Sequence, residues 1–246
     1  MFTKTIIIPI EICAYALTKK EVRALQVFIY LKLKCSGKIK INQQFLKNIA
    51  IELGLKSIKP IKTSIADLLL RHWISRSNKS GYYFVKGFER IRKLHNFRKR
   101  TGAECSISDI KNFKAFLIAS VISNLIIAQK RRLRAVERTK GGSKTSAFKQ
   151  SFFYPVANGA LAKILGISIS TAYEWKKLAK KQGYIKIRAN SRKIDYLDPE
   201  TLNQFKKYGD RPVKGTRTKK GHVFEQLPDN VYSSVSLRRR RKLEVF

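Results

Sequence analysis

The segment from Asn158 to Asn190 constrains the fold most, because its pattern specifies two short helices that meet at a fixed turn. Apolar residues recur at helical spacing before Gly166, and the small Ala162 suits the point where two helices touch. A glycine here allows the left-handed backbone that often ends a helix. Ser168 or Ser170 can then cap a second helix. The pattern therefore predicts a helix, a tight turn and a second helix.

The second of these helices has two different faces. Ala172, Trp175 and Leu178 share one side and are predicted to anchor the helix on a core. The outer side is polar and can meet phosphates or base edges. Its candidate contact residues are Ser168, Ser170, Thr171, Tyr173, Glu174 and Lys177. Glu174 is the most diagnostic, because a carboxylate near a duplex must accept from a cytosine amino group or orient a neighbouring cation.

The N-terminal part of the chain repeats this logic. Thr18 and Glu21 have the spacing of a capping box and predict a helix to about Lys34, followed by a short strand. Asn42 is predicted to cap a second helix that Gly54 ends, and Ser57 to cap a third from Ile58. Two β-prone segments joined by Ser77–Gly81 then predict a hairpin.

Basic residues gather on the parts that these patterns leave exposed. The first unit offers Lys56, Lys59, Lys62 and Thr63 on its third helix, with Arg76 and Lys79 on its hairpin. In the second unit, residues 182–197 predict another hairpin, which carries Arg188, Arg192 and Lys193. A single charge run is usually a solvated face, whereas this set indicates a continuous basic surface.

The overall charge indicates a polyanionic partner. Lysine and arginine number 53 against 16 acidic residues, a formal net charge of +37 in 246 residues. Such an excess favours nucleic acid first and an anionic membrane surface second.

Both units resemble the helix-turn-helix of bacterial and phage DNA-binding proteins, and each is followed by a wing-like hairpin. Two winged helices joined by a basic segment are similar in layout to Rep-type plasmid replication initiators, and equally to some phage or mobile-element regulators. The resemblance covers residues 5–197 and implies that both units dock on one duplex, with recognition helices in the major groove and wings on phosphates.

The predicted fold class is mainly α with small β-hairpin wings, an α+β arrangement of two winged-helix domains. The boundaries place the first domain at 1–88, a basic connector at 89–106, the second domain at 107–197 and a basic tail at 198–246. The tail is expected to be largely disordered, with one short helix at its start.

Enzyme signatures are absent from the sequence. There is no phosphate loop or zinc-binding H-E-x-x-H helix, and the three cysteines and three histidines do not cluster. "RHWISR" brings Arg71, His72 and Arg76 together, but no complete recombinase nucleophile constellation accompanies them. We therefore expect no enzyme, catalytic residue, metal, cofactor or small-molecule ligand.

Localisation follows from the apolar segments. The N-terminal apolar run is interrupted by Pro9 and Glu11, and the stretch from Ala115 to Ala128 falls short of the roughly 20 residues that span a bilayer. We expect a cytoplasmic, nucleoid-associated protein without a membrane partner.

The sequence thus predicts sequence-selective binding of double-stranded DNA, as a transcription regulator or replication initiator. A non-specific nucleic-acid coating or condensing protein is one alternative. An RNA-binding protein is the other, with Tyr82, Tyr83 or Phe84 as stacking residues. The target sequence and the formation of a homodimer stay open.

Overall fold

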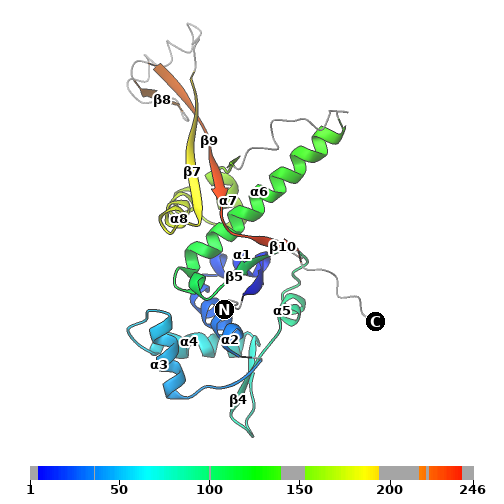
Figure 1. Ribbon diagram of the computed structural model, residues 1–246, viewed down its shortest axis with the longest axis vertical. Coiled ribbons are helices and arrows are strands. Elements are labelled where there is room, and N and C mark those ends of the chain that lie inside the picture. The colour runs from blue at the N-terminus through cyan, green and yellow to red at the C-terminus, as the bar shows by residue number, and fades with distance from the viewer. Residues whose placement is uncertain are drawn as a thin grey trace.

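The protein has a mixed α+β structure, in agreement with the predicted class. The computed structural model describes residues 5–35, 37–99, 101–139, 153–193, 216–219 and 222–239. Figure 1 shows helices packed around the centre of the molecule and a strand pair extending from each end of its longest axis.

The chain begins with a strand and two helices, β1 (Ile6–Pro9), α1 (Ile10–Thr18) and α2 (Val22–Lys34). The predicted capping box between Thr18 and Glu21 does not form. Thr18 ends α1 and donates its hydroxyl to the Leu165 carbonyl at 3.1 Å, while the Glu21 carboxylate pairs with Arg71. The apolar run before Thr18 is itself a buried helix, so both candidate capping groups lie at its C-terminal turn and contact other elements instead.

The first unit continues with one strand, two helices and a hairpin. Its elements are β2 (Lys38–Lys40), α3 (Gln43–Glu52), α4 (Lys59–Leu70), β3 (Ile74–Arg76) and β4 (Tyr82–Val85). The three strands form an antiparallel sheet in the order β2-β4-β3. Its hairpin therefore lies where the sequence predicts it.

Of the two helix caps predicted in this part of the first unit, one forms and the other does not. Asn42 caps α3, because its side-chain oxygen accepts from the Phe45 amide at 2.8 Å. Ser57 does not cap α4, since the helix begins at Lys59 and Ile58 occupies the capping position without a side-chain hydrogen bond. Pro60 lies in the first turn of α4, where its missing amide removes no helical hydrogen bond.

The predicted basic connector is more ordered than a linker. It contains α5 (Phe88–Leu94) and β5 (Thr101–Cys105). β5 is the central strand of a sheet in the order β1-β5-β10, where β10 is Leu237–Arg239. β1 pairs with residues 102–105 and β10 with residues 101–103, so Gly102 and Ala103 have antiparallel partners on both sides.

A short 3-10 turn, η1 (Ser108–Ile110), precedes the second unit. This unit contains α6 (Phe113–Thr139), β6 (Tyr154–Pro155), α7 (Asn158–Leu165), α8 (Ile169–Lys181), β7 (Ile185–Lys193), β8 (Thr216–Lys219) and β9 (His222–Ser233). Its main sheet has the order β6-β9-β7, and β8 pairs with β9. Apart from β8, which lies between β7 and β9 in the chain, the two units therefore share one order of helices and strands and one sheet order.

The structure differs from the prediction for the second wing and for the basic tail. Residues 185–193 form one long strand instead of a hairpin, and their partner is β9 in the segment assigned to the tail. Pro228 disfavours a strand in the sequence. In the sheet, Pro228 and Asp229 lie opposite Ala189 alone, a register shift of the kind that accommodates proline. The predicted helix at the start of the tail and residues 240–246 lie outside the described residues.

Among the described residues, one helix has the length and hydropathy of a membrane span, from Phe113 to Leu133 in α6. The most apolar 18-residue segment of this helix is 61% buried inside the protein. Buried residues such as Phe116, Leu117 and Ile118 join α6 to a continuous core that includes α1 and α2. α6 therefore links the two units, as the central position of its N-terminal half in Figure 1 also shows.

The close approach of β1 to β5 predicts a strict requirement for glycine at position 102. A methyl group on Gly102 would meet the Ile7 side chain and would lie 3.0 Å from the Ile8 carbonyl oxygen. We expect Gly102→Ala to lower the free energy of unfolding by about 1–3 kcal/mol, the usual cost of overpacking. Urea denaturation of both proteins measures this difference.

Gly159→Ala is the matched control, because nothing lies within 4 Å of the added carbon on helix α7. This control should leave stability unchanged or raise it by up to about 1 kcal/mol. Equal stability of Gly102→Ala and the wild-type protein would contradict the packing of β1 on β5.

Candidate nucleic-acid interface

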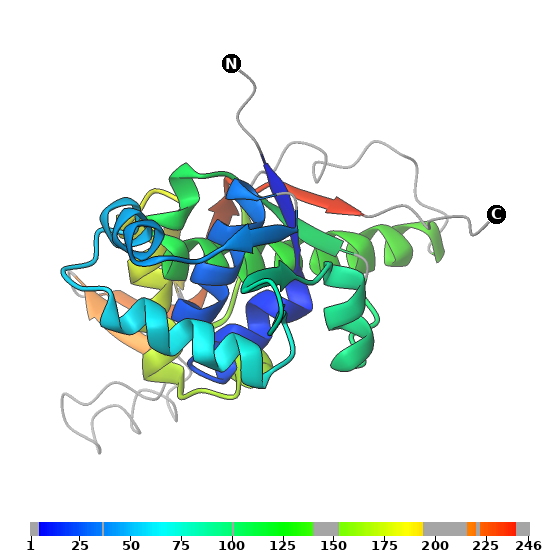
Figure 2. The same ribbon diagram turned by 90° about the horizontal axis from the view of Figure 1, so that it is seen from below.

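Helix α4 presents its predicted contact residues to solvent. Its opposite face packs on α2 through buried residues that include Ile61 and Leu68. Lys59, Lys62 and Thr63 are exposed on the outer face, and Lys56 is exposed in the turn before the helix. α4 lies toward the lower end of the molecule in Figure 1, and this end faces the viewer in Figure 2. The cationic side chains on its outer face are thus free of the core.

The hairpin of the first unit carries its basic residues at the edge and the tip. Arg76 is exposed on β3, and its guanidinium lies 5.6 Å from the ring centre of Tyr83. Lys79 is exposed in the turn, where Gly81 adopts a left-handed backbone and donates to the Ser77 carbonyl. The turn is therefore specified by local hydrogen bonds, and Lys79 projects from its end.

A cluster of hydroxyl groups opens α8. Gly166 has φ 61° and ends α7, as predicted, and Ser168 caps α8 by accepting from the Thr171 amide at 3.1 Å. The Ser168 hydroxyl also lies 2.9 Å from that of Ser170 and 2.8 Å from that of Thr171. Three predicted contact residues are thus gathered at a helix N-terminus, whose partial positive charge favours anions such as phosphate.

The next turn of α8 exposes the other predicted contact residues. Tyr173 is 44% exposed, and the Lys177 ammonium lies 4.5 Å from its ring centre. Lys177 also pairs with the Glu174 carboxylate at 3.4 Å, and this hydrogen bond is the main reason why the Lys177 pKa is raised. Glu174 therefore pairs with a neighbouring cation, and its role toward a duplex stays a prediction.

A buried lysine holds α8 in place, and sequence reasoning missed it. Lys176 is 1% exposed and donates to the Val156 carbonyl at 2.9 Å, with the Asp229 carboxylate at 3.4 Å. Burial lowers the Lys176 pKa, and Asp229 partly offsets this effect. The Lys176 ammonium therefore binds its proton less tightly in the folded state than in the unfolded state. Below the folded-state pKa this difference lowers the stability of the fold, and the effect disappears as pH rises from that pKa to 10.5.

The predicted anchors of α8 pack on the core. Ala172 is buried, and Trp175 and Leu178 are half-buried against the core, where they also line a cavity. Lys176 and Ala179 are buried in addition to these anchors. The position of Lys176 in the sequence suggests exposure to solvent, and its burial depends on the Val156 carbonyl and on Asp229, which is 53 residues away.

The second strand pair extends well beyond the helices. Arg188 is exposed on β7, with its guanidinium 4.0 Å from the ring centre of Phe153. The backbones of Arg192 and Lys193 lie further along β7, opposite Glu225 and Phe224 of β9. The predicted basic residues of the second wing therefore lie on one strand that leads away from α8.

Sequence reasoning also missed basic residues on other strands. Lys38 and Lys40 are exposed on β2, beside the first hairpin, and Lys38 lies 4.3 Å from the ring centre of Tyr82. Their alternation with Ile39 is the signal that could have identified them. Arg217 and Lys219 lie on β8, which pairs antiparallel with the next strand along the chain, β9.

Within the described part of the chain, no group of three or more His, Cys, Asp and Glu side chains is arranged to hold a metal ion. Cys13 and Cys105 are buried free thiols whose pKa values burial raises, and Cys35 is half-buried. No protein-family model matches the chain, and no curated protein or solved structure matches it. The geometry and charge of the surface are thus the basis for assigning a function.

The Lys176 contacts generate a prediction for the free energy of unfolding. Lys176→Met keeps a long side chain but leaves the Val156 carbonyl and the Asp229 carboxylate without their donor. We expect a loss of about 1–3 kcal/mol, the usual cost of unsatisfied buried groups. Urea denaturation followed by circular dichroism measures it.

Lys177→Met is the control on the same helix, because Lys177 is exposed and its substitution should change stability by at most about 0.5 kcal/mol. If both variants have the same stability, the Lys176 hydrogen bonds do not hold α8 in place.

Proposed function

We propose that the protein binds double-stranded DNA sequence-selectively through two winged-helix units, with α4 and α8 as recognition helices. The observation that carries this proposal is the repeated topology. Helix, strand, helix, helix and two further strands occur twice, with the sheet orders β2-β4-β3 and β6-β9-β7, and the second unit has one additional strand, β8, between β7 and β9. This is the arrangement in which a winged helix presents its third helix to a groove and its last two strands to the backbone.

The surface chemistry of the two helices supports base and phosphate contacts. α4 exposes Lys59 and Lys62, which suit phosphate or guanine acceptors. α8 begins with the Ser168, Ser170 and Thr171 hydroxyl cluster, which suits a phosphate at a helix N-terminus. Sequence selectivity would come from Thr63, Tyr173 and Glu174 together with these groups.

The placement of the hairpins supports simultaneous docking of both units. The β3–β4 hairpin and the β7–β9 pair lie at opposite ends of the longest axis (Figure 1). A duplex in contact with α4 and α8 would then have one basic strand pair toward each end. A protein arranged in this way would serve as a transcription regulator or a replication initiator.

Binding of single-stranded nucleic acid, including RNA, is a second candidate with one observation in its favour. Phe84 is 41% exposed on the central strand of the first sheet. Tyr82 and Tyr83 are less accessible, because Lys38 and Arg76 lie over their rings. One exposed ring offers fewer stacking positions than the repeated units offer groove contacts, so we favour the duplex.

Selection of binding sites from a random duplex pool at physiological salt tests the proposal directly. Two separated blocks of enriched sequence are expected, one for each unit. An unenriched pool despite tight binding would favour a charge-driven coating protein. Preferential capture of single strands in a parallel pool would favour RNA or single-stranded DNA.

The two recognition helices should control different blocks of the selected site. Lys59→Gln with Lys62→Gln should relax selection in one block, and Ser170→Ala with Tyr173→Ala should relax it in the other. Each pair removes exposed groups from a single helix, so the fold should persist. Repeating the selection with both double variants measures the effect, and loss of the same block from both would contradict separate docking.

Salt dependence provides a second prediction. If Lys62 contacts a phosphate, Lys62→Gln should reduce the slope of log K against log salt by about 1, because one fewer counterion is released. Fluorescence anisotropy with the selected duplex measures the slope. Lys93→Gln on α5 is the charge-matched control and should leave the slope unchanged.

A further inference from the structure

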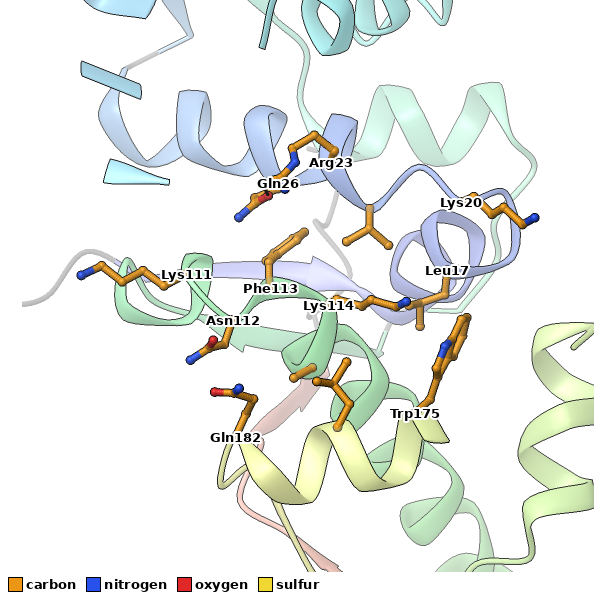
Figure 3. Close-up of a pocket in the computed structure, with 13 residues that line it drawn as sticks. Leu17, Lys20, Arg23, Gln26, Lys111, Asn112, Phe113, Lys114, Trp175 and Gln182 are labelled. Carbon is orange, nitrogen blue, oxygen red and sulfur yellow. Dashed lines mark hydrogen bonds between the residues drawn. The ribbon is translucent and has the colours of Figure 1, made fainter. Parts of the chain in front are cut away.

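A cavity of about 620 Å³ lies between the two units, and none of the residues assigned to the duplex surface lines it. The α1–α2 turn, the first turn of α6 and the inner side of α8 form its walls (Figure 3). Its volume falls within the range of about 300–1,000 Å³ that holds most small ligands. The cavity therefore has room for a ligand of the size of one nucleotide.

Every charged side chain among the described residues that line this cavity is cationic. Lys20 and Arg23 come from the α1–α2 region, and Lys111 and Lys114 from the start of α6. The nearby Glu21 does not line it, because its carboxylate pairs with Arg71. Four cations around one cavity repel one another, and a bound anion would relieve this repulsion.

One of these cations is held in position from inside the protein. Arg23 donates to the Gln26 side-chain oxygen at 2.6 Å. Gln26 is only 4% exposed, and its own amide group donates to the Ile110 carbonyl at 2.6 Å. The guanidinium is thus fixed at the wall before any ligand binds, which reduces the entropy lost on binding.

The first turn of α6 adds positive potential to the same wall. Residues 111–115 line the cavity, and the Phe116 amide donates to the Asn112 carbonyl at 3.1 Å. The amides that precede Phe116 in this turn have no carbonyl within the helix to bond. Together with Lys111, Lys114 and Arg23, they form a wall suited to phosphate oxygens.

The opposite wall is apolar and aromatic. Leu17, Leu178 and the half-buried Trp175 line it, and the Lys114 ammonium lies 4.9 Å from the indole ring centre. Figure 3 shows Lys114 extending across the cavity toward Trp175. A flat base can stack on the indole while Lys114 turns to a phosphate, so the two walls match the two ends of a nucleotide.

We infer that this cavity binds one nucleotide, with its phosphate against Arg23, Lys111 and Lys114 and its base against Trp175. The nucleotide comes either from solution or from an unpaired position of a nucleic-acid strand, since both present the same chemistry. This site does not depend on the proposed duplex contacts, because none of the outward residues of α4 or α8 lines it.

Calorimetric titration of the full-length protein with ATP, the tetranucleotide (dT)4 and inorganic pyrophosphate tests this inference without duplex DNA. Saturable one-to-one binding of ATP or (dT)4 is expected, with pyrophosphate at least about tenfold weaker because it lacks a base. Binding of ATP identifies a free nucleotide as a source, and binding of (dT)4 alone identifies a strand.

Arg23→Gln with Lys114→Gln should weaken this binding by about tenfold or more, since charge-assisted contacts to phosphate are lost. Lys93→Gln carries a matched loss of charge on α5 and should bind as the wild-type protein does. Lys111→Gln provides a second test at an exposed side chain, in case the double variant unfolds.

Fluorescence locates the base. Trp73 is 2% exposed, so quenching on titration should come from Trp175 and should disappear in Trp175→Phe. Pyrophosphate binding as tightly as ATP and (dT)4, equal binding by the cavity variants and the wild-type protein, or quenching that persists in Trp175→Phe would overturn the inference.

Discussion

The antiparallel pairing of β5 with both β1 and β10 is the constraint on which the arrangement of the molecule depends. It joins the start, the middle and the C-terminal part of the chain in one small sheet, and the close contact at Gly102 leaves no room for a side chain there. Because β10 follows β9 directly, this sheet also fixes where β9 runs. β9 in turn carries Asp229 to Lys176, and this buried contact sets the position of α8. The helix that we propose for recognition in the second unit is thus positioned by strands from both ends of the sequence.

The same packing places two kinds of basic surface in one molecule. The outward faces of α4 and α8 carry exposed polar and cationic side chains, which suits the proposed contacts with a duplex. The cavity between the units combines four cations with an indole ring, which suits the single nucleotide that we infer there. Cationic side chains thus line both an exposed helix surface and a cavity, and in these proposals the shape of each decides which form of nucleic acid it accepts.

Local features of the sequence were predictable because their partners lie within a few residues. Asn42 and Ser168 bond to amides three residues ahead, and Gly166 has the left-handed backbone that its position after an apolar run suggests. The first hairpin has a five-residue turn between β-prone segments, and it forms as predicted. The α+β class follows from the same short-range spacing. So does the exposure of the predicted contact residues whose side chains are described, among which only Thr171 is partly covered. Thr18 and Glu21 had a capping spacing too, but an unrecognised helix before them gave both groups other partners.

The sequence by itself determined the helix pairs, the caps at Asn42 and Ser168, the turn at Gly166 and the excess of positive charge. Only the tertiary structure decided that residues 101–105 are a central strand, that β9 and β10 complete two sheets, that Lys176 is buried and that a cationic cavity separates the units. The physical reason is the sequence distance of the partners. A cap or a turn is stabilised by neighbours that a local pattern contains, whereas the strand partner of β7, the carboxylate beside Lys176 and the walls of the cavity come from segments that only folding brings together.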